Sequence, residues 1–109
     1  MAKVNLCIKY CLRNKKLEYN IKGILQNNKL KYKDNLSLMI IDLNNNTLNK
    51  EQEYLFDFNN NNCLIKYQNM VVNLPIKVLN KEISSKYIFI KYKIENDIYE
   101  IKINIMEEI

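Results

Sequence analysis

The amino-acid sequence predicts an all-β protein: an antiparallel, up-and-down barrel of about eight short strands, with at most one short helical turn. Apolar and polar residues alternate along most of the chain, as in strands that bury one face. Short clusters of Asn, Asp and Gln separate the alternating runs and favour tight turns. No long stretch has the periodicity of an amphipathic helix. Strands joined by short connections are usually neighbours, and closing them into a barrel removes exposed edges; a two-sheet sandwich is the alternative.

The clearest strands are the last two, which form a predicted hairpin over residues 87–106. Their core-facing residues are Ile88, Ile90, Tyr92 and Ile94 on the first strand, and Tyr99, Ile101, Ile103 and Ile105 on the second. Asn96-Asp97 is the expected turn, because both residues tolerate positive φ. That turn places Lys93 opposite Glu100, a favourable pair, and Lys91 opposite Lys102, an unfavourable one.

The earlier strands follow in chain order. Alternation predicts strands over residues 4–12, 17–23, 30–32, 36–43, 54–58, 63–67 and 70–78. The first of these is expected to pair with the last strand of the chain and to close the barrel. Gly23 falls at a core-facing position, which indicates either a bend or an internal space. Pro75 cannot donate to a sheet ladder and indicates an edge strand. Residues 80–86 form a connection and are the place for a short helical turn.

Composition predicts one domain, residues 1–109, with a single modest core. Asn, Ile and Lys are strongly over-used. Their codons are rich in A and T, so the bias indicates an AT-rich genome. The formal net charge of +5 has the same explanation, or else it indicates a polyanionic partner.

The sequence contains no recognisable catalytic constellation. There is no His, the commonest general base and metal ligand, and the single Gly cannot build a glycine-rich phosphate loop. Cys7, Cys11 and Cys63 lack metal-site spacing, and an odd number of cysteines fits a reducing compartment. We therefore expect a cytoplasmic, non-enzymatic protein with no metal and no cofactor. The longest aliphatic run, residues 38–41, is far too short to span a membrane.

Several segments resemble the small bacterial calycin-like β-barrels of the YwiB type. The resemblance lies in V-N-L-C-I-K-Y near the N-terminus, in I-K-G-I around Gly23, in L-S-L-M-I-I-D ending at Asp42, and in the closing hairpin K-Y-I-F-I-K-Y-K-I-E-N-D-I-Y-E-I-K-I-N-I. It implies a calycin- or lipocalin-like barrel. That family has no settled activity, so the resemblance implies no functional residue. Its members tend to be longer and to carry glycines in several turns, which this chain lacks.

Core-facing tyrosines are the most distinctive side chains. Each packs its ring in the core and sends its hydroxyl to the backbone or the barrel rim, or else lines an internal pocket. The second interpretation predicts a ligand site formed by Tyr10, Tyr19, Gly23, Tyr92 and Tyr99. The expected function is a barrel that presents a pocket or surface to a small apolar molecule or a protein partner. Segment 36–43, apolar on both faces, is a candidate surface for self-association.

A different function is predicted from the outer face of the closing hairpin. Lysines flank aromatic rings on this face, an arrangement that lets cations contact phosphates while rings stack on bases. The residues of this candidate nucleic-acid surface are Tyr87, Phe89, Lys91, Lys93 and Lys102. Glu100 lies among them, and the chain contains no RNA-binding sequence signature.

Overall fold

The computed structural model describes residues 1–107 and confirms the all-β, antiparallel barrel. Within those residues there are eleven strands and no helix. The strands are β1 (Ala2–Leu12), β2 (Lys15–Gln26), β3 (Lys29–Asp34), β4 (Ser37–Asp42), β5 (Thr47–Lys50), β6 (Tyr54–Asp57), β7 (Asn62–Tyr67), β8 (Met70–Pro75), β9 (Lys77–Ile83), β10 (Tyr87–Ile94) and β11 (Asp97–Glu107). The count exceeds the nine segments expected from the sequence because β5 forms from residues expected in a loop and segment 70–78 breaks at Ile76.

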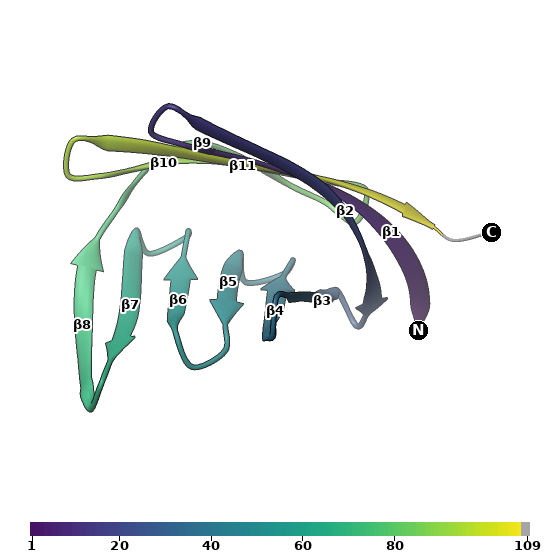
Figure 1. The fold of residues 1–109 in the computed structure, drawn as a ribbon, viewed down its shortest axis with the longest axis horizontal. Coiled ribbons are helices and arrows are strands. Elements are labelled where there is room, and N and C mark those ends of the chain that lie inside the picture. The colour runs from purple at the N-terminus through teal and green to yellow at the C-terminus, as the bar shows by residue number, and fades with distance from the viewer. Residues whose placement is uncertain (108–109) are drawn as a thin grey trace.

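The strands form one sheet in the order β8-β7-β6-β5-β4-β3-β2-β1-β11-β10-β9. Every hydrogen-bonded neighbour is consecutive in sequence except β1 and β11, which join the two ends of the chain as predicted. The sheet wraps into a nearly closed barrel whose two unpaired ends are β8 and β9. Figure 1 shows the long strands β1, β2, β9, β10 and β11 on one side and the short strands β4 to β8 on the other.

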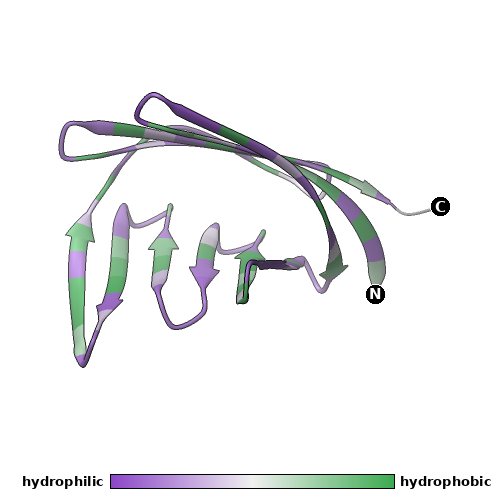
Figure 2. Cartoon of the chain, viewed as in Figure 1, coloured by the Kyte–Doolittle hydropathy of each residue, from purple (hydrophilic) through white to green (hydrophobic). Residues whose placement is uncertain are grey.

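The core lies between these two sides and contains only apolar and aromatic side chains among the described residues. Figure 2 shows the alternation that produces it, with hydrophobic and hydrophilic bands following one another along the strands. The most deeply buried side chains are Val4, Leu6, Ile8, Leu30, Met39, Ile41, Leu48, Cys63, Ile88, Ile90 and Ile103. The core-facing positions expected in β1, β10 and β11 are therefore largely confirmed.

The register of the closing hairpin differs from the predicted one by two residues. Its turn is Glu95-Asn96, so Ile94 pairs with Asp97, and Lys91 lies opposite Glu100. A shift of two residues leaves every side chain on its predicted face. It replaces the unfavourable contact between Lys91 and Lys102 with an opposite-charge pair, which is the more stable cross-strand arrangement.

Two turns among the short strands, from β4 to β5 and from β6 to β7, have the same hydrogen-bonding pattern. In the turn from β4 to β5, Asp42 Oδ1 accepts the backbone N–H groups of Asn44 and Asn45 at 3.0 and 3.1 Å. In the turn from β6 to β7, Asp57 Oδ1 accepts those of Asn59 and Asn60, both at 3.1 Å. An Asp side chain that binds the backbone two and three residues ahead fixes the turn without glycine.

Asparagine also supplies the left-handed backbone conformations at this end of the barrel. Asn28, Asn46 and Asn61 have φ of 59°, 55° and 55°. Their carbonyls accept the N–H groups of Leu43, Phe58 and Ile76, which directly follow β4, β6 and β8, at 2.9, 3.0 and 3.1 Å. Each hairpin is thereby tied to the next. Asn tolerates this conformation better than other non-Gly residues, so its abundance also serves the fold.

The expected helical turn at residues 80–86 is replaced by strand and a tight turn. β9 continues to Ile83, and the Ser84 hydroxyl accepts the N–H groups of Lys86 and Tyr87 at 3.3 and 3.1 Å. A serine turn of this kind satisfies the backbone locally without a helix. The described residues contain no helix with the length and hydrophobicity needed to cross a membrane.

Candidate functional site

The candidate site is a groove in the barrel wall where β2 and β3 separate. β2 pairs along nearly its whole length with β1, but only Gly23 to Gln26 pair with β3. The sheet therefore forks at Gly23, leaving a groove of about 600 Å³. This volume lies within the range of small-molecule sites, roughly 300–1,000 Å³.

The groove has an apolar floor and a basic rim. Its floor is formed by Ile21, Gly23, Ile24, Tyr32 and Leu38, and its rim by Lys3, Lys22, Lys31 and Lys33. No acidic residue among residues 1–107 lines it. Within residues 1–107, Lys3, Lys31 and Lys33 have no ion-pair partner. The rim is therefore a local concentration of positive charge beside apolar surface.

Strand register explains why lysine and apolar side chains alternate there. On the outer face Ile24 lies between Lys3 of β1 and Lys31 of β3, and Lys31 lies between Ile24 and Ile40 of β4. Lys33 lies opposite Leu38. Each lysine stem thus runs beside an apolar neighbour while its ammonium group reaches water.

On the inner side of the wall, Gly23 marks close packing rather than an internal space. A Cβ at this position would lie 2.9 Å from the backbone oxygen of Lys31 and 3.0 Å from Leu6 Cδ1. Leu6 and the β3 backbone occupy the place where a side chain would project. Of the two explanations that the sequence left open, the structure supports a close approach of strands at the bend.

Two of the predicted site tyrosines gather beneath the groove. The hydroxyl oxygens of Tyr10 and Tyr32 lie 3.3 Å apart, and the rings of Tyr10 and Tyr19 have centroids 6.1 Å apart. Burial raises the pKa of all three phenols above the ordinary value. The buried Tyr19 hydroxyl has no hydrogen-bond partner of good geometry among the described residues. Tyr32 also lines the groove, so the cluster and the groove share one side chain.

The other two predicted tyrosines lie in a separate aromatic cluster. Tyr92 and Tyr99 stack with ring centroids 5.4 Å apart. The Tyr92 ring also packs against those of Phe56 and Phe58, with centroids 5.1 and 5.6 Å apart, respectively. Burial raises the pKa of Tyr92. The structure therefore brings Tyr10 together with Tyr19 and Tyr92 together with Tyr99, but not all five predicted residues into one pocket.

The outer face of the closing hairpin places its predicted residues side by side. Phe89 lies opposite Lys102, whose Nζ is 5.5 Å from the ring centroid. Lys91 lies opposite Glu100, and Phe89 also lies opposite Glu82 of β9. Tyr87 and Lys93 project from the same face of β10, by strand alternation. The candidate nucleic-acid surface is thus contiguous, but two carboxylates interrupt its positive charge.

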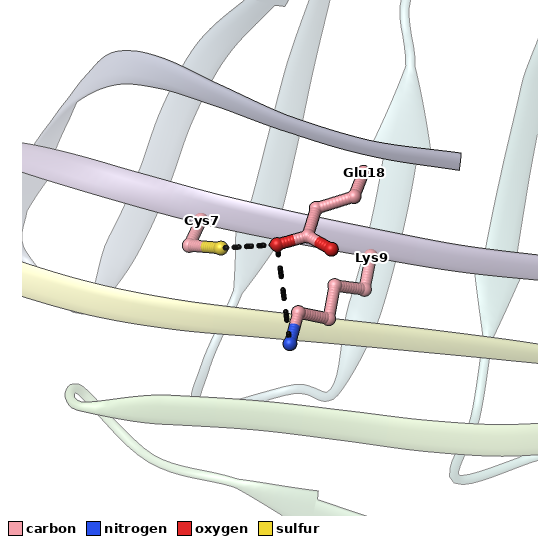
Figure 3. Close-up of polar contacts among 3 residues, drawn as sticks. All are labelled: Cys7, Lys9 and Glu18. Atoms are coloured by element: carbon pink, nitrogen blue, oxygen red, sulfur yellow. Dashed lines mark hydrogen bonds and ion pairs between the residues drawn. The ribbon is translucent and has the colours of Figure 1, made fainter. Parts of the chain in front are cut away.

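Mixed charge continues across the outer face of β1 and β2. Figure 3 shows Glu18 Oε1 between two groups of β1: it accepts a hydrogen bond from Cys7 Sγ at 3.8 Å and lies 4.0 Å from Lys9 Nζ. Cys7 and Cys11 are free thiols, and Cys63 is buried in the core. Among the described residues, no group of Cys, Asp or Glu could hold a metal ion.

Segment 36–43 is divided between the core and the outer surface. Met39 and Ile41 are buried, whereas Leu38 and Ile40 are half-buried on the outer face. Leu36 is 99% exposed in the turn between β3 and β4. The outer half of this segment contributes Leu38 to the groove.

The sequence interpretation missed the lysine rim. A signal for it exists in K-L-K-Y-K at residues 29–33, where lysines alternate with the buried Leu30 and Tyr32. The fork of the sheet could not be seen, because it depends on where β3 stops pairing with β2. Comparison of the chain with family models, curated proteins and solved structures finds no match.

Proposed function

We propose that this protein is a non-enzymatic binding barrel that holds an anionic amphiphile, a molecule with an apolar body and one negative head group, in the groove at Gly23. The observation that carries the proposal is the lysine rim around an apolar floor. An apolar floor alone would fit any hydrophobic molecule. A rim that includes Lys3, Lys31 and Lys33, which have no ion-pair partner within residues 1–107, favours a negative head group.

Apolar contact would supply most of the affinity. Removing Ile21, Ile24 and Leu38 from water stabilises a complex by roughly 25 cal/mol per Å² of buried apolar surface. The lysines would orient the ligand, since flexible ammonium groups at a rim contribute to specificity and association rate more than to affinity. The ligand lies in the wall rather than inside the barrel, because Leu6 fills the space inward of Gly23.

Calorimetric titration with three dodecyl compounds tests the proposal: dodecanoate, dodecanol and dodecyltrimethylammonium, each below its micellar concentration. The chains are equal in length, so differences in affinity report the head group. We expect dodecanoate to bind more tightly than dodecanol, and the cationic compound to bind most weakly. Equal binding of all three, or none at all, overturns the proposal.

Matched charge variants locate the site. Lys31→Glu with Lys33→Glu reverses two rim charges, whereas Lys77→Glu with Lys86→Glu makes the same change in net charge outside the groove. We expect the first pair to weaken dodecanoate binding about 10-fold or more, which corresponds to about 1.4 kcal/mol. The second pair should change it little. Equal weakening by both pairs would show that only the overall charge attracts the ligand.

The alternative function, binding of single-stranded nucleic acid by the closing hairpin, is favoured by the contiguous set of Phe89, Lys91 and Lys102. Contact with phosphates requires that affinity fall steeply with salt. A filter-binding titration with single-stranded RNA at two salt concentrations tests it. The variant Phe89→Ala should weaken binding if a base stacks on this ring. Absence of binding at low salt excludes this function.

A further inference from the structure

The two unpaired ends of the sheet differ sharply in chemistry. β9 carries charged residues at Lys77, Lys81 and Glu82, and Lys81 Nζ contacts Asn59 Oδ1 at 2.9 Å across the barrel. β8 carries none, and the stretch from Gln68 to Ile76 is free of charge in a chain of which 27% is charged. Charged edges resist pairing with another chain, whereas long apolar edges invite it.

Apolar side chains of β8 are open to solvent on both of its faces. Met70 is 64% exposed, Val71 63% and Val72 39%. Strand alternation places Met70 and Val72 on the core-facing side, with Cys63 and Ile65 of β7, yet both remain exposed to solvent. Figure 1 shows β8 as the last arrow of the short strands, with no strand beyond it. Such an exposed apolar edge is unusual in a protein that remains monomeric.

The hairpin of β7 and β8 determines which backbone groups of β8 are unpaired. Its turn has two residues, so the flanking residues Tyr67 and Met70 are joined by the turn hydrogen bond. Bonding alternates along an antiparallel strand, so the N–H and C=O groups of Val71 and Asn73 point away from β7. Pro75 is the next outward position, and it lacks an N–H. The free edge is thus a short, defined set of donors and acceptors.

We propose that β8 pairs with β8 of a second copy of this chain, antiparallel about a two-fold axis through Val72. In this register Val71 of each copy exchanges both backbone hydrogen bonds with Asn73 of the other. Val72 meets its own counterpart, and Met70 meets Leu74. A two-fold interface brings the same patch of each copy together and must be self-complementary. The uncharged, apolar β8 satisfies this condition.

The neighbouring register contains incomplete pairs. An axis through Asn73 would pair Val71 with Pro75, which removes one donor from each copy. Because each copy carries a net charge of +5, long-range repulsion opposes association. Added salt screens that repulsion. The dimer is therefore expected to strengthen with salt. An anionic peptide is not favoured as the partner, because β8 carries no charge to attract it.

Sedimentation velocity between about 1 μM and about 1 mM, the range of weak to moderate affinities, tests the proposal. We expect a reversible dimer. Asn73→Pro removes one outward N–H per copy and spares the bonds to β7, so it should weaken the dimer about 10-fold or more, since two intermolecular bonds are lost. Asn73→Ala keeps the N–H group in each copy and should leave the affinity of the dimer unchanged. A monomer at the highest concentration, or equal effects of the two variants, overturns the proposal.

Disulfide trapping tests the register itself. In a variant with Cys7 and Cys11 replaced by Ser, Val72→Cys places two thiols on non-hydrogen-bonded partners whose Cα atoms are about 4.5 Å apart. That separation lies within the disulfide range of roughly 4.4–6.8 Å. Val71→Cys is the matched control, since its counterpart lies diagonally, roughly 7–8 Å away. Mild oxidation should crosslink the first variant and not the second. Equal crosslinking contradicts the proposed register.

Discussion

Lys91 lies directly opposite Glu100 on the outer face of the closing hairpin. Their side chains are half-buried, and the Glu100 carboxylate forms an ion pair with Lys102, whose Nζ lies 4.0 Å from Glu100 Oε1. Opposite charges at directly facing positions stabilise an antiparallel pair, and like charges destabilise it. This pairing therefore favours the observed register of the strands that carry the core residues Ile88, Ile90 and Ile103.

A charge-reversal cycle tests this pairing. Lys91→Glu should lower the free energy of unfolding by about 0.2–1 kcal/mol, because it places two carboxylates opposite each other. Adding Glu100→Lys should restore most of the loss. Urea titration measures each variant. Lys93→Glu is the comparison, since Lys93 faces Ile98 and should gain nothing from Glu100→Lys. Rescue of Lys93→Glu instead would show that the register is wrong.

Gly23→Ala should destabilise the barrel. The added methyl would meet the backbone oxygen of Lys31 at 2.9 Å and Leu6 Cδ1 at 3.0 Å, and the backbone atom cannot move without disturbing the β2–β3 ladder. Overpacking of this kind costs roughly 1–3 kcal/mol. Denaturant unfolding measures the loss, with the exposed Asn20→Ala on the same strand as the control. An unchanged or increased stability would falsify the close approach of the strands at the bend.

Stability should fall in acid because of Asp42 and Asp57. Hydrogen bonds lower the pKa of both carboxyls below the ordinary value of 3.8, chiefly that from the Asn45 N–H for Asp42 and that from the Asn60 side chain for Asp57. A lowered native pKa adds stability above the unfolded value, and this stability disappears as pH falls through the native pKa. Urea titrations from about pH 5 to pH 2 should show the loss.

The pH dependence has a matched control. The pair Asp42→Asn and Asp57→Asn should be less stable at neutral pH and should lose less on acidification, because neither side chain titrates. The pair Glu51→Gln and Glu82→Gln removes two carboxylates that accept no such turn bonds. It should keep the acid response of the wild type. If both pairs flatten the response equally, the turns are not its source.

Alkaline pH should destabilise the protein through its buried tyrosines. Burial raises the pKa of Tyr10, Tyr32 and Tyr92 above the ordinary value of 10.0. A raised native pKa contributes stability below the unfolded value, and this is lost as pH rises above about 10. Tyr32→Phe removes the hydroxyl that lies 3.3 Å from that of Tyr10 and should cost about 0.5–1.5 kcal/mol at neutral pH.

Two measurements across a pH titration follow this transition. Phenolate absorbance reports ionisation of the tyrosines, and circular dichroism reports unfolding. Tyr32→Phe should make the alkaline loss of stability less steep, since one buried phenol no longer titrates. Tyr67→Phe is the control, because Tyr67 is 65% exposed and has no buried hydroxyl to protect. An identical alkaline response of the two variants would contradict a role for burial.

The sequence alone determined the all-β class, the faces of the long strands and the closure of β1 onto β11. These features follow from alternation with period two, which depends only on local strand geometry and on the exclusion of apolar side chains from water. Ile88, Ile90, Ile101 and Ile103 are buried for this reason. Pro75 likewise indicated an edge strand, because its missing N–H is a local property.

Tertiary structure decided which strands meet and where they part. A shift of two residues in the closing hairpin keeps every side chain on its face, so alternation cannot distinguish the registers. The pairing of Lys91 with Glu100 in the folded hairpin does distinguish them. The groove exists because β3 stops pairing at Gly23. The tyrosines separate into two clusters because one set lies on β1, β2 and β3 and the other on β10 and β11. Both depend on contacts between residues distant in sequence, for which a local pattern carries no information.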